Sequence, residues 1–236
     1  MNEPLVLLPG MMCDARLFGP QIAELSAEMA IMVAPITMGE RIEEIASQIL
    51  MVAPQKFALA GLSMGGIVAM ELLRRAPERI TRLALMDTNP LAETPQYAAS
   101  REPQIVGARA GRLLDVMRDE MKPNYLAPGP ARAPVLALVM DMAEALGPQV
   151  FIRQIRALQR RRDQQGTLRK CRVPTLVLCG EHDQLCPIKR HTFMAELIPH
   201  AVLRIVEDAG HMPTLEQPEA TTHALRDWMK QPFVLR

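Results

Sequence analysis

The chain has 236 residues, a length that fits one or two domains and buries a large core without disulfide or metal support. Its 27 basic and 26 acidic residues leave a net charge of +1, which excludes a nucleic-acid-binding protein that depends on bulk positive charge. The same balance, with 49% hydrophobic residues, excludes a disordered polyelectrolyte.

The sequence predicts neither a membrane span nor secretion. Its longest apolar runs are shorter than the roughly 20 residues that cross a bilayer. A signal peptide has a positive charge before its apolar segment, whereas no positive charge precedes the apolar residues 5–8 of this chain. The four cysteines have no C-x-x-C or metal-ligand spacing, so we expect reduced thiols in a cytoplasmic protein: Cys13, Cys171, Cys179 and Cys186.

Short apolar runs alternate with helical patterns along most of the chain. The runs lack the polar alternation of half-exposed strands, so they indicate a parallel sheet covered on both faces. Right-handed crossovers then give a doubly wound, mostly parallel α/β fold. We expect strands at residues 4–9, 29–36, 57–62, 80–86, 174–179 and 202–206, and helices at 15–25, 41–52, 66–75, 188–197 and 218–229.

The strand rhythm stops between residues 91 and 170. This stretch shows helical patterns broken by proline and glycine, and its 13 basic and 8 acidic residues give it a net charge of +5. We therefore expect an α/β core made of residues 1–90 and 171–236, with an all-helical cap inserted at 91–170.

The strongest motif is Gly61-Leu62-Ser63-Met64-Gly65, which matches G-x-S-x-G between a predicted strand and a predicted helix. In that context a sharp, strained turn exposes the hydroxyl of Ser63. The two glycines leave room for the backbone to approach itself. The N-terminus of the following helix favours a developing negative charge. Ser63 is therefore the predicted nucleophile.

A serine nucleophile needs a base within hydrogen-bond reach. His211 follows the last predicted strand in Gly210-His211, which places it at the carboxyl edge of the sheet, where ligand sites of open α/β sheets lie. We expect His211 to be the base. The other four histidines are interpreted as ordinary polar or surface residues: His182, His191, His200 and His223.

The base in turn needs a carboxylate that orients its ring. Asp183 follows the penultimate predicted strand at the same sheet edge, and the order Ser63, Asp183, His211 is that of hydrolases built on such a sheet. Asp87, at the end of an earlier strand, and Glu181 are the alternatives.

An oxyanion needs two preorganised N–H donors. We expect one from Met64, the residue after the nucleophile. The other should come from the loop after the first strand, residues 9–13, with Met11 preferred and Met12 as the alternative.

With these motifs in place, the chain resembles the α/β-hydrolase superfamily over nearly its whole length, and within it the small carboxylesterases and enol-lactone hydrolases. The resemblance implies the α/β-hydrolase fold, Ser63 as nucleophile, His211 as general base and acid, and Asp183 as orienting acid. It also implies the amides of Met11 and Met64 as the oxyanion hole. Many relatives have His-Gly before the oxyanion residue, whereas this chain has Pro9-Gly10.

The resemblance implies cleavage of a carboxylic ester through an acyl-enzyme, with no metal or organic cofactor. Lactone hydrolysis, C–C bond hydrolysis and acyl transfer on the same triad remain alternatives. A non-catalytic ligand-binding protein with this fold is a further one.

The cap is expected to close over Ser63. Its apolar side chains are candidates for the pocket wall: Leu113, Val116, Met117, Met121, Val139, Met140 and Met142. Its basic side chains are candidates for attracting an acidic substrate or an acidic carrier protein: Arg109, Arg112, Arg118, Arg153, Arg156, Arg160, Arg161 and Arg162.

Overall fold

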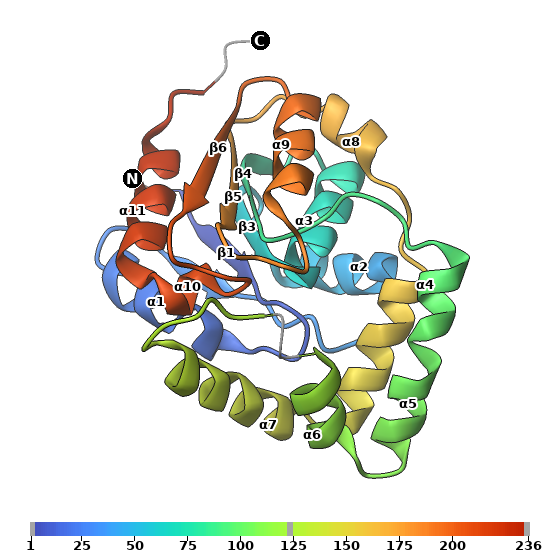
Figure 1. Cartoon of the computed structure of the whole chain (residues 1–236). Coiled ribbons are helices and arrows are strands. Elements are labelled where there is room, and N and C mark those ends of the chain that lie inside the picture. The colour runs from blue at the N-terminus through green and yellow to red at the C-terminus, as the bar shows by residue number, and fades with distance from the viewer. Residues whose placement is uncertain (1–2, 122–124, 234–236) are drawn as a thin grey trace.

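Six parallel strands form one sheet in the order β2-β1-β3-β4-β5-β6 (Figure 1). This computed structural model describes residues 3–121 and 125–233, without the side chains of residues 120 and 121. The strands are β1 (Leu5–Leu8), β2 (Ile31–Val33), β3 (Phe57–Leu62), β4 (Ile80–Met86), β5 (Thr175–Gly180) and β6 (Ala201–Val206). Each predicted strand is present, and the second is shorter than the apolar stretch that predicted it.

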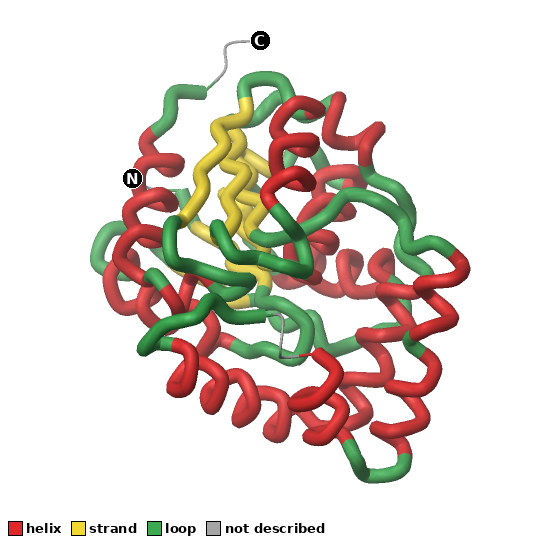
Figure 2. Tube along the Cα trace, viewed as in Figure 1, coloured by secondary structure: helices red, strands yellow, loops and turns green. Residues whose placement is uncertain are grey.

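Helices cover both faces of the sheet (Figure 2). Residues that alternate along a strand point to opposite faces. Leu5 and Leu7 therefore lie in one apolar cluster with Trp228, whereas Val6 and Leu8 lie in another. One face carries α1 (Gly19–Leu25) and α11 (Pro218–Lys230), and the other carries α2 (Ile42–Val52), α3 (Met64–Arg75) and α9 (Ile188–Leu197). The expected doubly wound architecture is confirmed.

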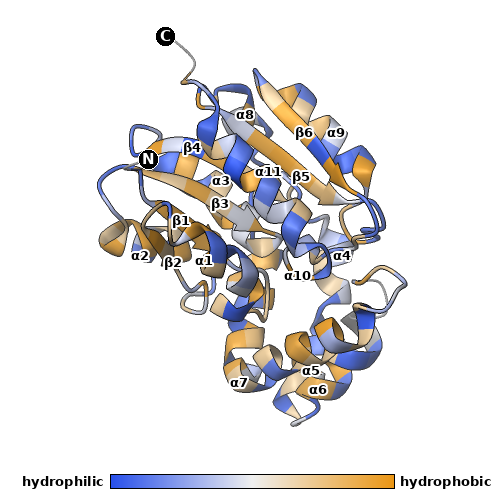
Figure 3. Ribbon diagram, turned by 90° about the vertical axis from the view of Figure 1, so that its left-hand side faces the viewer, coloured by the Kyte–Doolittle hydropathy of each residue, from blue (hydrophilic) through white to orange (hydrophobic). Residues whose placement is uncertain are grey.

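Only helical elements occur between β4 and β5 in the described part of the chain. Figure 3 shows α5, α6 and α7 gathered beyond the edge of the sheet, apart from the helices that cover its faces. The elements are α4 (Pro95–Ser100), α5 (Glu102–Arg109), α6 (Leu113–Asp115), the π-helical turn η2 (Val116–Met121), α7 (Arg132–Gln159) and α8 (Gln165–Arg169).

The helix α7 has 28 residues and is the one described helix that is long and apolar enough to cross a membrane by length and composition. Its backbone breaks at Gly147 (φ 76°, ψ 173°), directly before Pro148. A positive φ is easy for glycine, and the proline cannot continue the hydrogen-bond ladder. The two halves therefore run in different directions and pack against α4, α5, α6 and α10 (Pro213–Glu216).

Candidate active site

The turn between β3 and α3 holds Ser63 in a strained conformation, with φ 54° and ψ −116°. A Cβ atom added to Gly61 would lie 2.3 Å from the carbonyl oxygen of Gly65. A Cβ added to Gly65 would lie 2.1 Å from the carbonyl oxygen of Leu8. Both distances are far inside van der Waals contact. The two glycines are therefore required by the closeness of the backbone, as the motif predicted.

The loop after β6 carries His211 and is fixed by backbone and side-chain contacts. The His211 N–H donates to the carbonyl of Tyr125 at 2.6 Å, and the two rings lie 5.2 Å apart. Glu216, in the short helix α10, accepts the N–H groups of Gly210, Met212 and Ala127. Sequence reasoning missed Glu216, which is buried. The feature that could have indicated it is an acidic residue five positions after His211.

Three side chains from distant parts of the sequence form a continuous hydrogen-bonded chain. The Oγ of Ser63 lies 2.9 Å from Nε2 of His211, and Nδ1 of His211 lies 2.8 Å from Oδ2 of Asp183. His211 and Asp183 are each 2% exposed. Because Asp183 accepts at Nδ1, the neutral ring carries its proton there, and Nε2 accepts the hydroxyl proton of Ser63.

The structure separates the three candidate acids. Asp183 alone contacts His211; its other oxygen accepts the N–H groups of Leu185 and Cys186. Burial opposes its charge, but the field of His211 and these hydrogen bonds outweigh burial and lower the pKa of Asp183 to about 2. Glu181 is exposed and its carboxylate accepts from a backbone N–H on the loop before His211.

Asp87 is fully buried and its Oδ1 accepts the N–H of Gly180. Burial, followed by the neighbouring charge of Asp183, raises the pKa of Asp87 well above its usual value. A side-chain hydrogen bond between Asp87 and Asp183 acts in the same direction, since it raises the pKa of Asp87 and lowers that of Asp183. These conditions favour the neutral acid at Asp87 and the charged one at Asp183.

Met11 and Met64 line the same cavity as Ser63, and no acceptor for the N–H of either residue is found within the described ranges. The N–H of Met12, the alternative donor, is already used: it donates to Oε1 of Gln154 at 2.9 Å. Gln154 comes from α7, is fully buried and also donates to the carbonyl of Ile36. It therefore fixes the loop that carries Met11, a role that its position within a long helix did not suggest.

His191 differs from its interpretation as an ordinary polar or surface residue, because it is fully buried behind Ser63. Its Nε2 accepts the N–H of Thr88 at 3.1 Å, and the hydroxyl of Thr88 donates to the carbonyl of Ser63 at 2.7 Å. Burial lowers the pKa of His191 to about 4, against the opposing field of Asp183. His191 thus supports the strained turn in its neutral form.

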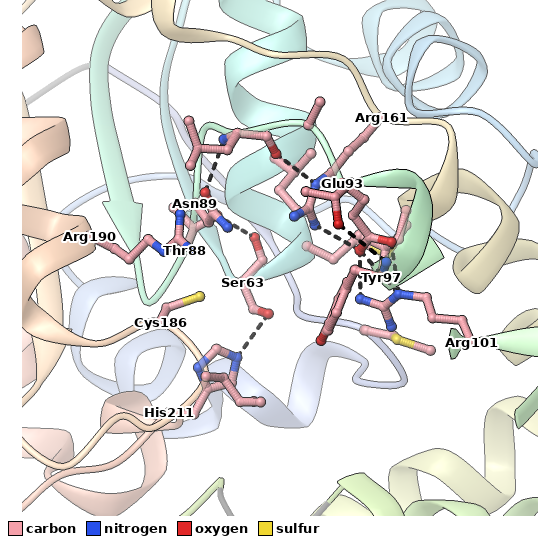
Figure 4. Close-up of a pocket in the computed structure, with 18 of the residues that line it drawn as sticks. Ser63, Thr88, Asn89, Glu93, Tyr97, Arg101, Arg161, Cys186, Arg190 and His211 are labelled. Carbon is pink, nitrogen blue, oxygen red and sulfur yellow. Dashed lines mark hydrogen bonds and ion pairs between the residues drawn. The ribbon is translucent and has the colours of Figure 1, made fainter. Parts of the chain in front are cut away.

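A cavity of about 470 Å³ opens at Ser63 (Figure 4). The apolar side chains expected in its wall line no part of it: Leu113, Val116, Met117, Val139 and Met142 are buried in the core clusters, and Met140 packs against one of them. The side chain of Met121 is outside the described residues. The helical segment instead contributes a majority of polar and aromatic residues and three apolar ones: Glu93, Thr94, Tyr97, Arg101, Gln104, Tyr125 and Arg161, with Leu91, Ala92 and Leu158.

Two groups of side chains have the spacing of metal ligands in the part of the chain that the structure describes. One consists of Asp183, Cys186 and His211, where both carboxylate oxygens of Asp183 are already occupied by N–H donors. The other consists of Glu181, His182 and Asp208, near the surface. Neither arrangement offers a pre-formed, buried set of open ligands.

The six-stranded parallel sheet with helices on both faces is the fold of a hydrolase of the α/β class. A family model of the alpha/beta hydrolase family matches residues 5–224, and the chain belongs to that family. A pimeloyl-[acyl-carrier protein] methyl ester esterase of Aromatoleum aromaticum is 27% identical, with 96% of this chain and 98% of that protein covered.

Two solved structures of hydrolases superpose on nearly the whole chain. A thermophilic esterase from Thermogutta terrifontis, with malate bound, superposes with a TM-score of 0.87 at 27% identity, covering 97% of this chain and 89% of that one. The enol-lactonase from Burkholderia xenovorans superposes with a TM-score of 0.85 at 25% identity, covering 98% and 92%. These similarities support ester hydrolysis as the class of reaction.

Proposed function

We propose that this protein is a serine hydrolase that cleaves a carboxylic ester of a small or medium-sized substrate through an acyl-enzyme. The observation that carries the proposal is the chain of hydrogen bonds from Ser63 through His211 to Asp183, which faces a cavity of about 470 Å³. That volume lies in the range of small-molecule sites. The esterases among the similar proteins support the same reaction.

In the first half-reaction the Oγ of Ser63 attacks the ester carbonyl carbon while Nε2 of His211 takes its proton. The tetrahedral oxyanion is stabilised by the N–H groups of Met11 and Met64. Asp183 holds the imidazole in its reactive tautomer and stabilises the imidazolium. When the intermediate collapses, the C–O bond to the alcohol breaks and His211 returns the proton to the leaving oxygen.

In the second half-reaction water replaces the alcohol. His211 removes a proton from the water as its oxygen attacks the acyl carbon, and the same ring then protonates Oγ of Ser63 as the acid leaves. Each half-reaction therefore begins with the neutral imidazole of His211 accepting a proton and ends with the imidazolium donating it.

Lactone hydrolysis is the second candidate, because the enol-lactonase superposes over nearly the whole chain. An internal ester would react by the same steps, except that the alcohol stays attached to the acyl group. Product analysis on an ester and a lactone of equal size distinguishes the two candidates.

The test compares the wild-type protein with Ser63→Ala on p-nitrophenyl acetate and butyrate. We expect turnover by the wild type and a loss of about a million-fold in kcat in the variant, as when other serine hydrolases lose their nucleophile. A fluorophosphonate should label the wild type on Ser63 and leave the variant unlabelled. Turnover by Ser63→Ala near the wild-type rate would overturn the proposal.

A further inference from the structure

The wall of the cavity at Ser63 carries more positive than negative charge. Three of its lining residues are arginines, Arg101, Arg161 and Arg190, and one is a carboxylate, Glu93. A cavity excludes most of the water that would solvate these charges, so an excess of one sign there favours a ligand of the opposite sign.

One carboxylate is shared between two of the arginines. The side chain of Glu93 is fully buried, and Arg101 binds it through Nε and Nη2 at distances from 2.7 to 3.1 Å. The guanidinium of Arg161 lies further away, at 3.4 Å from the same carboxylate. The side chains of Arg101 and Arg161 are 12% and 10% exposed. Glu93 neutralises one guanidinium, so one buried positive charge is left over.

The excess charge resides mainly on Arg161, because Arg101 makes the closer, two-point contact with Glu93. The Nε of Arg161 donates to the carbonyl of Leu91 at 2.9 Å, and its Nη2 has no acceptor within the described ranges. Burial lowers the pKa of Arg161 although Glu93 raises it. A desolvated guanidinium with open donors is suited to a carboxylate, whose two oxygens match its planar fork.

A third cation lies across the cavity on α9. Arg190 is half-buried, and its guanidinium has no acidic partner among the residues that the structure describes. Arg161 and Arg190 both line the cavity, together with Cys186. In the view of Figure 4 the two arginines lie on either side of Ser63.

Three arginines of the helical segment that do not line the cavity have carboxylate partners of their own. Arg156, Arg160 and Arg162 are each paired with a carboxylate within 3.4 Å, on Glu102, Glu40 and Glu43 in that order. These three positive charges are therefore compensated outside the cavity, whereas the cavity keeps an excess. This favours recognition inside the cavity over attraction by the outer surface.

We propose that Arg161 forms a subsite for a free carboxylate, with Arg190 adding to the positive charge of the cavity from its other side, so that the preferred substrates are esters carrying a carboxylate remote from the scissile bond. The proposal rests on the proposed function and adds the substrate class to it. Arg161 binds the carboxylate directly, Arg190 adds a second positive charge, and Arg101 with Glu93 holds Arg161 in place.

The experiment uses matched substrates. The monomethyl esters of glutaric, adipic and suberic acid are compared with the analogues in which the free carboxylate is replaced by a carboxamide, which keeps the shape and removes the charge. For the best chain length we expect the wild type to prefer the carboxylate at least about tenfold in kcat/KM. Arg161→Met and Arg190→Gln should each reduce that ratio about tenfold, the size expected for a hydrogen bond to a charged group.

The variants are chosen so that folding does not obscure the result. Arg161→Met leaves Glu93 and Arg101 as a balanced pair, and Arg190→Gln removes a side chain without an acidic partner in the described part of the chain. The control is Arg109→Gln, an exposed arginine of α5 that does not line the cavity, and its ratio should equal that of the wild type.

A binding measurement completes the test. The Ser63→Ala protein keeps the cavity but cannot turn over, so the monomethyl ester should raise its melting temperature and the carboxamide should not. Adding Arg161→Met should abolish the shift. No preference in the wild type, or an equal change in Arg109→Gln, would overturn the subsite. If the wild type turned over none of the esters, p-nitrophenyl acetate included, the proposed function itself would be overturned.

Discussion

The floor and the roof of the cavity are held in place by different interactions. The floor consists of the loops that carry Ser63, Asp183 and His211, and it is fixed by backbone hydrogen bonds and by glycines that no larger residue can replace. The roof consists of the lining side chains of residues 91–170, and its charged side chains are held by the ion pairs of Glu93 with Arg101 and Arg161. In the function proposed above, the floor carries out the reaction and the roof selects the substrate.

The largest effect should come from the floor, at Asp183. We expect Asp183→Asn to reduce kcat by about ten-thousand-fold, because an amide stabilises neither the reactive tautomer nor the imidazolium. Asp87→Asn should stay within about threefold of the wild type, because Asp87 favours its neutral form and an amide oxygen can still accept the N–H of Gly180.

Steady-state kinetics on p-nitrophenyl butyrate measure both variants. Equal losses in the two would mean that the carboxylates act as one unit, and the distinction between a charged and a neutral acid would be wrong.

The second effect concerns the stability of the floor. Gly65→Ala places a Cβ about 2.1 Å from the carbonyl oxygen of Leu8, a contact that only backbone movement relieves. We expect a loss of about 4 kcal/mol or more in the free energy of unfolding, in the range of severe steric substitutions.

The matched control is Gly166→Ala in α8, where an added Cβ meets no atom within 4 Å. This change should raise stability by up to about 1 kcal/mol, because alanine favours helix more than glycine does. Urea denaturation measures the free energy of unfolding of both variants. Equal values would show that the turn at Ser63 is not rigid.

The floor and the roof also differ in how far the sequence predicts them. The floor is encoded locally: G-x-S-x-G, Gly180 to Asp183 and Gly210-His211 each follow a strand, and a parallel sheet brings the ends of its strands to one edge. The roof is not encoded in this way. Helical periodicity shows that Val139 and Met142 are apolar, but not which partner covers them, and they pack into the core rather than facing Ser63.

The supporting side chains escaped prediction for a related reason. Gln154 reaches the loop of Met12 across 142 positions of sequence, and His191 reaches Thr88 across 103. Neither residue has a local motif, since its partner is a backbone N–H that any residue could supply. Only the three-dimensional arrangement reveals that a polar residue inside a helix is a support for the site.

The third effect is a pH dependence of stability. The pKa of His191 is about 4 in the folded protein and 6.5 in an exposed histidine, so the unfolded chain binds the proton more strongly. The contribution of neutral His191 to the free energy of unfolding is therefore complete above pH 6.5. As the pH falls from 6.5 to 4, about 3 kcal/mol of it is lost.

His191→Gln keeps an acceptor for the N–H of Thr88 but does not titrate. Urea denaturation between pH 7 and 4 should therefore show a smaller loss in this variant than in the wild type, while the carboxylates contribute equally to both. Parallel stability curves for the two proteins would contradict the buried, neutral state of His191.

The smallest effect should come from the outer side of the roof. Arg162 contacts Glu43 of α2 at 2.9 Å, but its side chain is 54% exposed, so water and salt screen the pair. Arg162→Ala should cost less than about 1 kcal/mol in the free energy of unfolding. High salt should reduce the wild-type stability toward that of the variant. A loss above 2 kcal/mol would show that this ion pair holds the helical segment on the core as firmly as the glycines hold the floor, and the contrast between the two regions would fail.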